Sequence, residues 1–162
     1  MIILGIDPGY AIVGYGLIQA VNGKYAPVEY GAITTEAGEE FNRRLEVIYD
    51  SVTALLKKYP VDAVSIEKLF FYSNKTTVIG VAEARGVILL AVQKAGVKVY
   101  EYTPNEVKIA VTGYGRALKP QVMEMTRRLL FLPAVPKPDD TADALAMAIC
   151  HGQATGSGLR RA

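Results

Sequence analysis

The hydrophobic and polar positions of the chain follow two periods, and the N-terminal part has the period of strands. Residues 2–7 form a short apolar run that ends at an aspartate followed by Pro-Gly. Residues 12–20 and 25–34 alternate between apolar and polar side chains, with Asn22-Gly23 between them. Because Asn-Gly between two such runs favours a tight hairpin, the pattern predicts three strands in an antiparallel meander.

After residue 34 the pattern alternates between helices and strands. Apolar residues recur every three or four positions over 39–59, which predicts a helix that ends before Pro60. Residues 62–67 and 97–102 have the pattern of strands, and residues 74–95 between them have that of a helix. Strands separated by helices are parallel neighbours with right-handed crossovers.

The last third is predicted to be mainly helical. Thr103-Pro104-Asn105-Glu106 has the residues of a capping box at a helix start, and a glycine-rich loop follows at 112–116. Further helices are expected over 120–130 and 139–151, joined by an extended proline-rich segment. The predicted fold is α/β, with a five-stranded mixed sheet (three antiparallel strands, then parallel ones) flanked by helices.

Length and composition fit one folded domain. The 162 residues are 51% hydrophobic, which excludes a disordered chain, and no unbroken apolar run approaches the roughly 18 residues of a membrane span. We expect a domain over residues 1–152 and a flexible basic tail over 153–162. The single cysteine, Cys150, excludes an internal disulfide and favours a reducing, cytoplasmic location.

The net charge of +2 is small, but the basic residues are unevenly distributed. The segment 108–137 carries six basic residues and one acidic residue, a net charge of +5. A basic face of this kind can bind the phosphates of a nucleic acid, although solvated helix charges would give the same count.

Four acidic residues have unusual settings. Asp7 and Glu67 each end an apolar strand-like run, while Asp140 and Asp143 are three residues apart near the start of the last helix. Each also has an ordinary explanation, because Asp-Pro-Gly is a common turn, a glutamate can end a strand, and Asp139 or Asp140 can cap a helix. One metal site would explain all four together.

Oxygen-only ligands favour Mg²⁺ or Mn²⁺ over zinc. Two such ions about 4 Å apart can clamp the attacking and leaving oxygens of a phosphoryl displacement, so the sequence predicts metal-assisted phosphoryl chemistry without a protein nucleophile. His151 is expected to cap the C-terminus of the last helix, and Cys150 to serve in packing.

Taken in order, these pieces resemble the RuvC family of Holliday-junction resolvases, which have an RNase H-like fold. The resemblance covers nearly the whole chain and rests on four segments: Ile3-Leu4-Gly5-Ile6-Asp7-Pro8-Gly9, Ile66-Glu67-Lys68-Leu69-Phe70, Ala84-Arg85-Gly86-Val87 and Asp140-Thr141-Ala142-Asp143-Ala144-Leu145-Ala146. It implies that Asp7, Glu67, Asp140 and Asp143 are the acidic positions of the family. Asp139 is the alternative to Asp140, which is preferred because it keeps the three-residue spacing to Asp143.

The resemblance also implies a homodimer that nicks four-way junction DNA symmetrically with Mg²⁺ or Mn²⁺ and cooperates with the branch-migration proteins RuvA and RuvB. A two-fold substrate favours a two-fold enzyme. The helix that begins near Asn74 is the candidate dimer surface, with core packing as the alternative for part of its apolar face. That face carries Val78, Ile79, Val81, Val87 and Leu90.

Further DNA contacts are expected around the acidic cluster. Phe70, in Phe70-Phe71-Tyr72, could stack on unpaired bases, or some of these aromatics could be core. By resemblance, Lys108 and Lys119 lie near the scissile phosphate. The expected backbone contacts, for which plain surface charge is the alternative, are Arg116, Arg127 and Arg128.

Three other functions are compatible with parts of the pattern. One is a YqgF-type RNase H-fold nuclease that acts on RNA. Another is an actin-like sugar kinase or ATPase, which would need a second domain. The third is a non-catalytic DNA-binding module, which the four acidic residues oppose because they would repel the DNA backbone.

Overall fold

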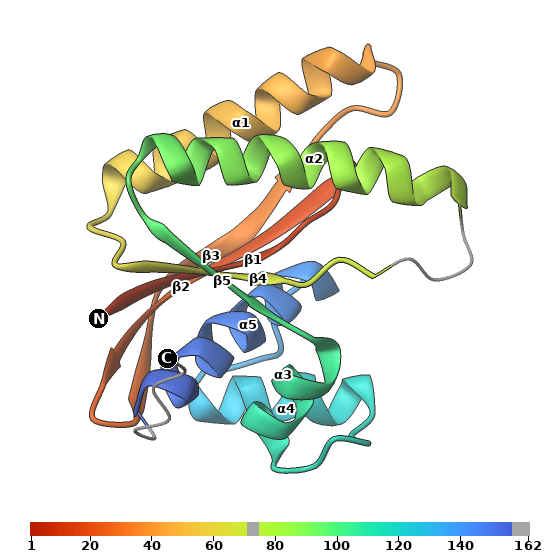
Figure 1. The fold of residues 1–162 in the computed structure, drawn as a ribbon. Coiled ribbons are helices and arrows are strands. Elements are labelled where there is room, and N and C mark those ends of the chain that lie inside the picture. Colours follow the sequence, from red (N-terminus) through yellow and green to blue (C-terminus); the bar gives the residue numbers. More distant parts are fainter. Residues whose placement is uncertain (71–74, 157–162) are drawn as a thin grey trace.

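In the computed structural model, which describes residues 1–70 and 75–156, a five-stranded sheet lies between two layers of helices (Figure 1). The strand order is β3-β2-β1-β4-β5. The pairs β1–β2 and β2–β3 are antiparallel, and the pairs β1–β4 and β4–β5 are parallel, which confirms the predicted mixed sheet. The strands are β1 (Ile2–Asp7), β2 (Ile12–Val21), β3 (Lys24–Thr34), β4 (Ala63–Glu67) and β5 (Lys98–Tyr102).

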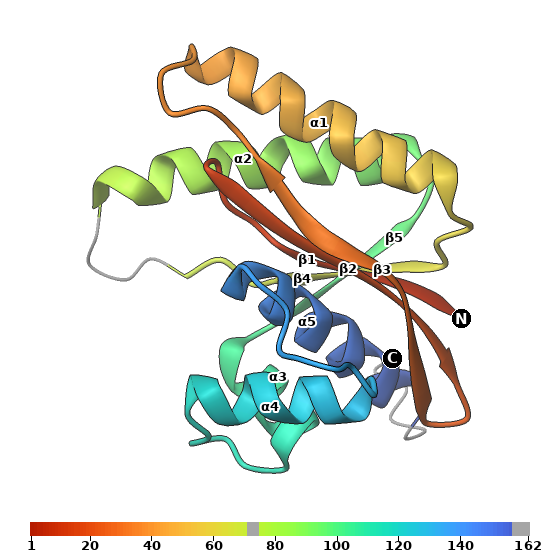
Figure 2. The same ribbon diagram turned by 180° about the vertical axis from the view of Figure 1, so that it is seen from behind.

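The helices divide between the two faces of this sheet, as Figure 2 shows from behind. Two helices cover one face: α1 (Phe41–Lys58) and α2 (Lys75–Lys94). On the other face lies α5 (Asp139–Gly156), and α3 (Pro104–Thr112) and α4 (Lys119–Leu129) pack against α5.

Two local sequence signals form the expected structures. Asn22 and Gly23 have φ angles of 51° and 75°, so both residues of the β2–β3 turn adopt the left-handed conformation that Asn-Gly tolerates. At α3 the Thr103 hydroxyl accepts from the Glu106 amide at 3.2 Å, and the Glu106 carboxylate accepts from the Thr103 amide at 2.8 Å. This reciprocal pair is the predicted capping box.

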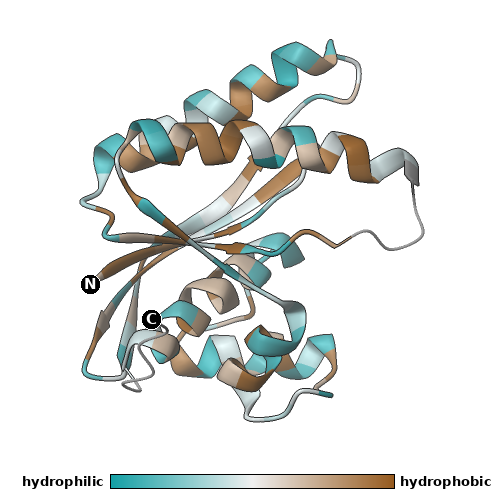
Figure 3. Ribbon diagram, viewed as in Figure 1, coloured by the Kyte–Doolittle hydropathy of each residue, from teal (hydrophilic) through white to brown (hydrophobic). Residues whose placement is uncertain are grey.

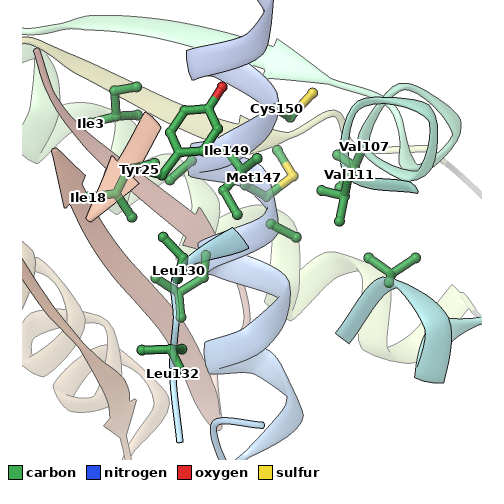
Figure 4. Packing of buried hydrophobic residues seen from close by; sticks show 14 of the residues in the cluster. Ile3, Ile18, Tyr25, Val107, Val111, Leu130, Leu132, Met147, Ile149 and Cys150 are labelled. Carbon is green, nitrogen blue, oxygen red and sulfur yellow. The ribbon is translucent and has the colours of Figure 1, made fainter. Parts of the chain in front are cut away.

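The central strands are apolar on both faces because each face is covered by helices. Ile3 of β1 joins the core beneath α3, α4 and α5, which Figure 4 shows from close by. Its neighbours Leu4 and Ile6 join the core beneath α1 and α2. Alternate residues of β1 therefore face opposite layers.

Glycines in β1 and β2 allow α5 to lie directly on the sheet. A Cβ atom on Gly5 would lie 1.9 Å from the Ala144 carbonyl oxygen, and one on Gly14 would lie 1.9 Å from the Asp140 carbonyl oxygen. Both distances are far too short for atoms that are not bonded to each other, so both positions need glycine. These contacts fix the first turns of α5 beside the end of β1.

The predicted end of the last helix was wrong. The helix was expected to end at His151, but α5 continues to Gly156 and includes residues 153–156 of the expected tail. His151 is 2% exposed, and its Nδ1 lies 2.8 Å from the Tyr102 hydroxyl oxygen. It therefore packs inside the molecule instead of capping a helix end, whereas Cys150 is buried as expected. Residues 157–162 lie outside the described residues.

Helix α2 is rich in apolar residues, and much of its ribbon is brown in Figure 3. Among the described helices, its segment 76–94 is the one long and apolar enough to cross a membrane, judged by length and composition alone. The sequence prediction counted unbroken runs, and Glu83 and Arg85 interrupt this one. Because Ala84 and Ile88 are fully buried against the core, the segment has the features of a domain helix with a second, outward apolar face.

Candidate active site

The register of the parallel strands brings Asp7 and Glu67 together. Gly5 of β1 lies opposite Ser65 of β4, and Ile6 lies opposite Ile66, so Asp7 and Glu67 are the next residues on adjacent strands. Adjacent strands are about 4.8 Å apart. The Ser65 hydroxyl donates to the Met147 carbonyl of α5 at 2.7 Å, and Glu67, two residues later, faces the same layer. Both carboxyl groups therefore lie at one sheet edge, on the α5 side.

The start of α5 adds the other two acidic residues. Asp140 packs its backbone and Cβ against Gly14, the residue paired with Asp7 in the β1–β2 ladder. Asp143 is one helical turn further on. Asp139 binds the Lys137 ammonium at 2.8 Å in an exposed ion pair. The packing thus places Asp140 beside Asp7, whereas Asp139 is paired with Lys137.

The four carboxyl groups lie close enough to influence one another's ionisation. Burial, together with the charges of Asp143, Glu67 and Asp140, raises the pKa of Asp7 from 3.8 to about 8. Burial and the charge of Asp143 raise the pKa of Glu67. Burial also raises the pKa of Asp143, against the opposing effect of Lys119. Such mutual opposition to ionisation is typical of carboxylates that share a site.

The donor chemistry of this cluster fits a hard divalent cation, because all the donors are carboxylate oxygens. As the side chains lie, however, no group of three or more His, Cys, Asp or Glu residues in the described part of the chain could hold a metal ion. The carboxylates repel one another, so they do not converge on one point without a cation. In addition, the Lys119 ammonium binds the Asp143 carboxylate at 2.9 Å. Closing the cluster around an ion therefore requires side-chain rotations.

Among the predicted basic contacts, Lys119 is brought to the acidic cluster. It begins α4, and its ion pair with Asp143 joins α4 to α5. Arg116 is exposed in the loop before α4, and Lys108 is half-buried on α3. Arg127 lies in the last turn of α4, at the far end from Lys119, where its guanidinium binds Glu124 and the Leu132 carbonyl. In the described part of the chain, no hydrogen bond or ion pair joins these three residues to the four carboxylates.

A small pocket adjoins the cluster. It measures about 170 Å³ and contains Glu67 in its wall. Phe70 also lines it, is 39% exposed, and lies with its ring centroid 5.9 Å from the Lys68 ammonium. Phe71 and Tyr72 lie outside the described residues. The other lining residues are Pro8, Lys68, Leu69, Val81 and Pro104.

Sequence reasoning missed Arg85 of α2. Its motif was singled out, but no role was assigned to it. The guanidinium Nε donates to the Glu67 carbonyl oxygen at 3.4 Å, so Arg85 touches the backbone of a candidate metal ligand. The available signal was a charge inside an otherwise apolar helical segment.

Comparison with known families agrees with this geometry. A family model described as crossover junction endodeoxyribonuclease RuvC matches residues 3–151. The chain belongs to the RuvC family. Relatives of the same name include a Clostridioides difficile protein, 56% identical over 93% of this chain and 89% of its own. Another, from Ruminiclostridium cellulolyticum, is 53% identical over 94% and 92% of the two chains.

Solved RuvC structures have the same fold. The Thermus thermophilus RuvC structure matches with a TM-score of 0.91 and 34% identity, covering 98% of this chain and 97% of that one. The same protein in complex with a Holliday junction substrate matches with a TM-score of 0.92. This member of the RuvC family therefore has the RNase H-like fold that the sequence predicts.

Proposed function

We propose that the chain resolves four-way (Holliday) DNA junctions by metal-assisted hydrolysis of phosphodiester bonds, as paired symmetric nicks. The observation that carries the proposal is the gathering of Asp7, Glu67, Asp140 and Asp143 at one sheet edge by β1, β4 and α5. Membership of a family of crossover junction endodeoxyribonucleases supports the same chemistry. The 34% identical Thermus protein bound to a Holliday junction supports the substrate.

We assign the four carboxylates as ligands of two Mg²⁺ ions, with Mn²⁺ as a substitute. When bound, the ions would supply an activated water and stabilise the charge on the leaving oxygen. The contributions of the chain are to hold four oxygens at the edge of a rigid sheet and to provide a cation beside them. Lys119 is that cation, and it can exchange its Asp143 partner for a phosphate oxygen.

A homodimer is proposed through α2. Its exposed stripe contains Ile79 and Leu90, which are 64% and 52% exposed, with Gly86 between them. A Cβ atom on Gly86 would meet nothing within 4 Å, so none of the described residues requires glycine there. A glycine inside a helix costs about 1 kcal/mol relative to alanine. Close approach of a second α2 across a two-fold axis would account for that cost.

The remaining assignments extend outward from the cluster. Phe70 is proposed to stack on a base unpaired at the junction, beside the pocket that Glu67 lines. Lys108, Arg116 and Arg127 are proposed to contact the DNA backbone. RuvA and RuvB are the proposed partners, and the cytoplasm is the proposed location.

The decisive experiment uses a synthetic immobile four-way junction, with each strand labelled in turn and the nicks mapped in Mg²⁺. We expect pairs of nicks at symmetric positions on two strands of like polarity. Asp7→Asn should abolish the nicks while the protein still shifts the junction in a gel. Unpaired nicks, or cleavage retained by Asp7→Asn, would contradict the proposal.

Linear RNA is the matched alternative substrate, because an RNase H-fold nuclease of the YqgF type would cut it instead. Cleavage of RNA in preference to the junction would show that the site is that of an RNA nuclease. The actin-like and non-catalytic alternatives find no support in the family match.

A further inference from the structure

Arg85 is an exception to the pattern of α2. Its side chain is 12% exposed, although it is a charged residue within an apolar segment of the helix. Burying a guanidinium is costly unless its donors are satisfied. The groups that the guanidinium contacts therefore indicate the role of Arg85 in the structure.

The guanidinium joins two strands. Its Nε donates to the Glu67 carbonyl oxygen, the last of β4, at 3.4 Å. Its NH2 group forms an ion pair with the Glu101 carboxylate of β5. A single planar group thus connects α2 to the ends of two parallel strands, which one ammonium could not do with the same geometry.

Glu67 needs such a support because it is paired with β5 on one side but lies beyond the end of the β1–β4 ladder on the other. The β1–β4 ladder ends at the pair Ile6–Ile66, one residue before Glu67. On the other side Glu67 is paired with Tyr102 of β5, and the Lys68 amide donates to the Tyr102 carbonyl at 2.9 Å. Arg85 reinforces this end of β4 from the α2 layer.

We propose that Arg85 is a positioning residue that holds the Glu67 backbone, and through it the Glu67 carboxylate, in place to bind a divalent cation. The proposal rests on the metal role assigned to Glu67 under the proposed function. It also connects the helix proposed for dimerisation to the active site, because Val81 and Arg85 of α2 reach the Glu67 segment while Ile79 and Leu90 face outward.

The test compares Arg85→Ala, Arg85→Lys and Glu101→Gln with the wild type. Arg43→Ala is the matched control, since Arg43 forms an exposed ion pair with Glu46 on α1, away from the sheet edge. Three quantities are measured: the rise in Tm as Mn²⁺ is added without DNA, the single-turnover cleavage rate of a four-way junction, and junction affinity without metal.

For Arg85→Ala we expect the Mn²⁺ concentration that gives half of the Tm rise to increase by about 10-fold or more, and cleavage to slow about 10- to 100-fold. Junction affinity without metal should stay within about threefold of wild type, because the Arg85 side chain is largely buried. Glu101→Gln and Arg85→Lys should have smaller effects in the same direction, since each leaves one of the two contacts possible. Arg43→Ala should match the wild type.

Wild-type Mn²⁺ dependence in Arg85→Ala would overturn the proposal, as would an equal loss of junction affinity and cleavage. If Arg85→Ala does not fold, Arg85→Met, which keeps the volume of the side chain but removes both contacts, decides by the same Mn²⁺ titration. A wild type that binds Mn²⁺ through Arg85-dependent geometry but leaves junctions intact would refute the proposed function and leave this inference standing.

Discussion

At the scale of single residues, Asp7 shows how the acidic site lowers the stability of the folded protein. Burial and the neighbouring carboxylates raise its pKa to about 8, so between about pH 4 and pH 8 the folded chain retains a proton that the unfolded chain has released. Stability falls with rising pH wherever the folded state binds more protons. Ionisation of the site therefore lowers the free energy of unfolding, as is common for functional carboxylates.

We predict that the free energy of unfolding of the metal-free protein falls between pH 5 and pH 8, and that Asp7→Asn removes a few kcal/mol of that fall. The raised pKa values of Glu67 and Asp143 act in the same direction and remain in the variant. Urea unfolding in EDTA at the two pH values measures the difference. If Asp7→Asn has the wild-type pH dependence, the Asp7 carboxyl is not desolvated in solution.

Lys119 should affect chemistry more than binding, because it lies beside the acidic cluster and is one of several cations proposed to contact DNA. Lys119→Ala is expected to slow single-turnover cleavage about 100-fold and to change junction affinity only a few-fold. Lys137→Ala is a suitable control, since Lys137 also forms an exposed pair with an aspartate, Asp139. Equal losses of rate and affinity in Lys119→Ala would show that it only binds the backbone.

At the scale of elements, α4 ends in a Schellman motif whose left-handed position is occupied by an unfavourable residue, Phe131. The Leu132 amide donates to the Arg127 carbonyl and the Phe131 amide to the Arg128 carbonyl, which is the Schellman arrangement. Phe131 takes the left-handed position with φ of 53°, where glycine is preferred, and its side chain is 89% exposed.

Phe131→Gly should therefore stabilise the protein by about 1 kcal/mol, a rise in Tm of roughly 2–4 °C for a domain of this size. Phe131→Ala keeps a Cβ atom in the strained conformation and should give little of that gain. Thermal unfolding of the two variants under identical conditions checks the prediction. If alanine stabilises as much as glycine, the removal of an exposed aromatic ring is responsible and the backbone is not.

Elements were predictable from sequence where the determinant is local. The Asn22-Gly23 turn and the Thr103–Glu106 capping box depend on neighbouring residues, and both form as predicted. The extension of α5 depends on tertiary packing instead, because Gly152 lies against the Tyr25 ring of β3 and carries no helical signal. Arg85 was missed for the same reason, since its partners are a carbonyl and a carboxylate on two distant strands.

At the scale of the whole molecule, the positions of the four acids could be predicted because strand ends and helix spacing determine them. The close approach of α5 to the sheet also depends on Gly5 and Gly14, whose role is visible only once the helix lies over them. The side-chain arrangement also differs from a closed metal site, because Lys119 holds Asp143. The orientation of these side chains depends on which charged groups become neighbours after folding, and the sequence pattern does not specify that.

The proposed dimer gives the last prediction, because Gly86 has opposite effects on the single chain and on the pair. Gly86→Leu should raise helix stability by up to about 1 kcal/mol, since a Cβ atom there would meet none of the described residues within 4 Å. In the dimer the same side chain would hold the two copies of α2 apart. Sedimentation measurements should therefore show Gly86→Leu as a monomer and Gly96→Ala, at a left-handed turn after α2, as a dimer. A fully dimeric Gly86→Leu would place the two-fold contact elsewhere on the molecule.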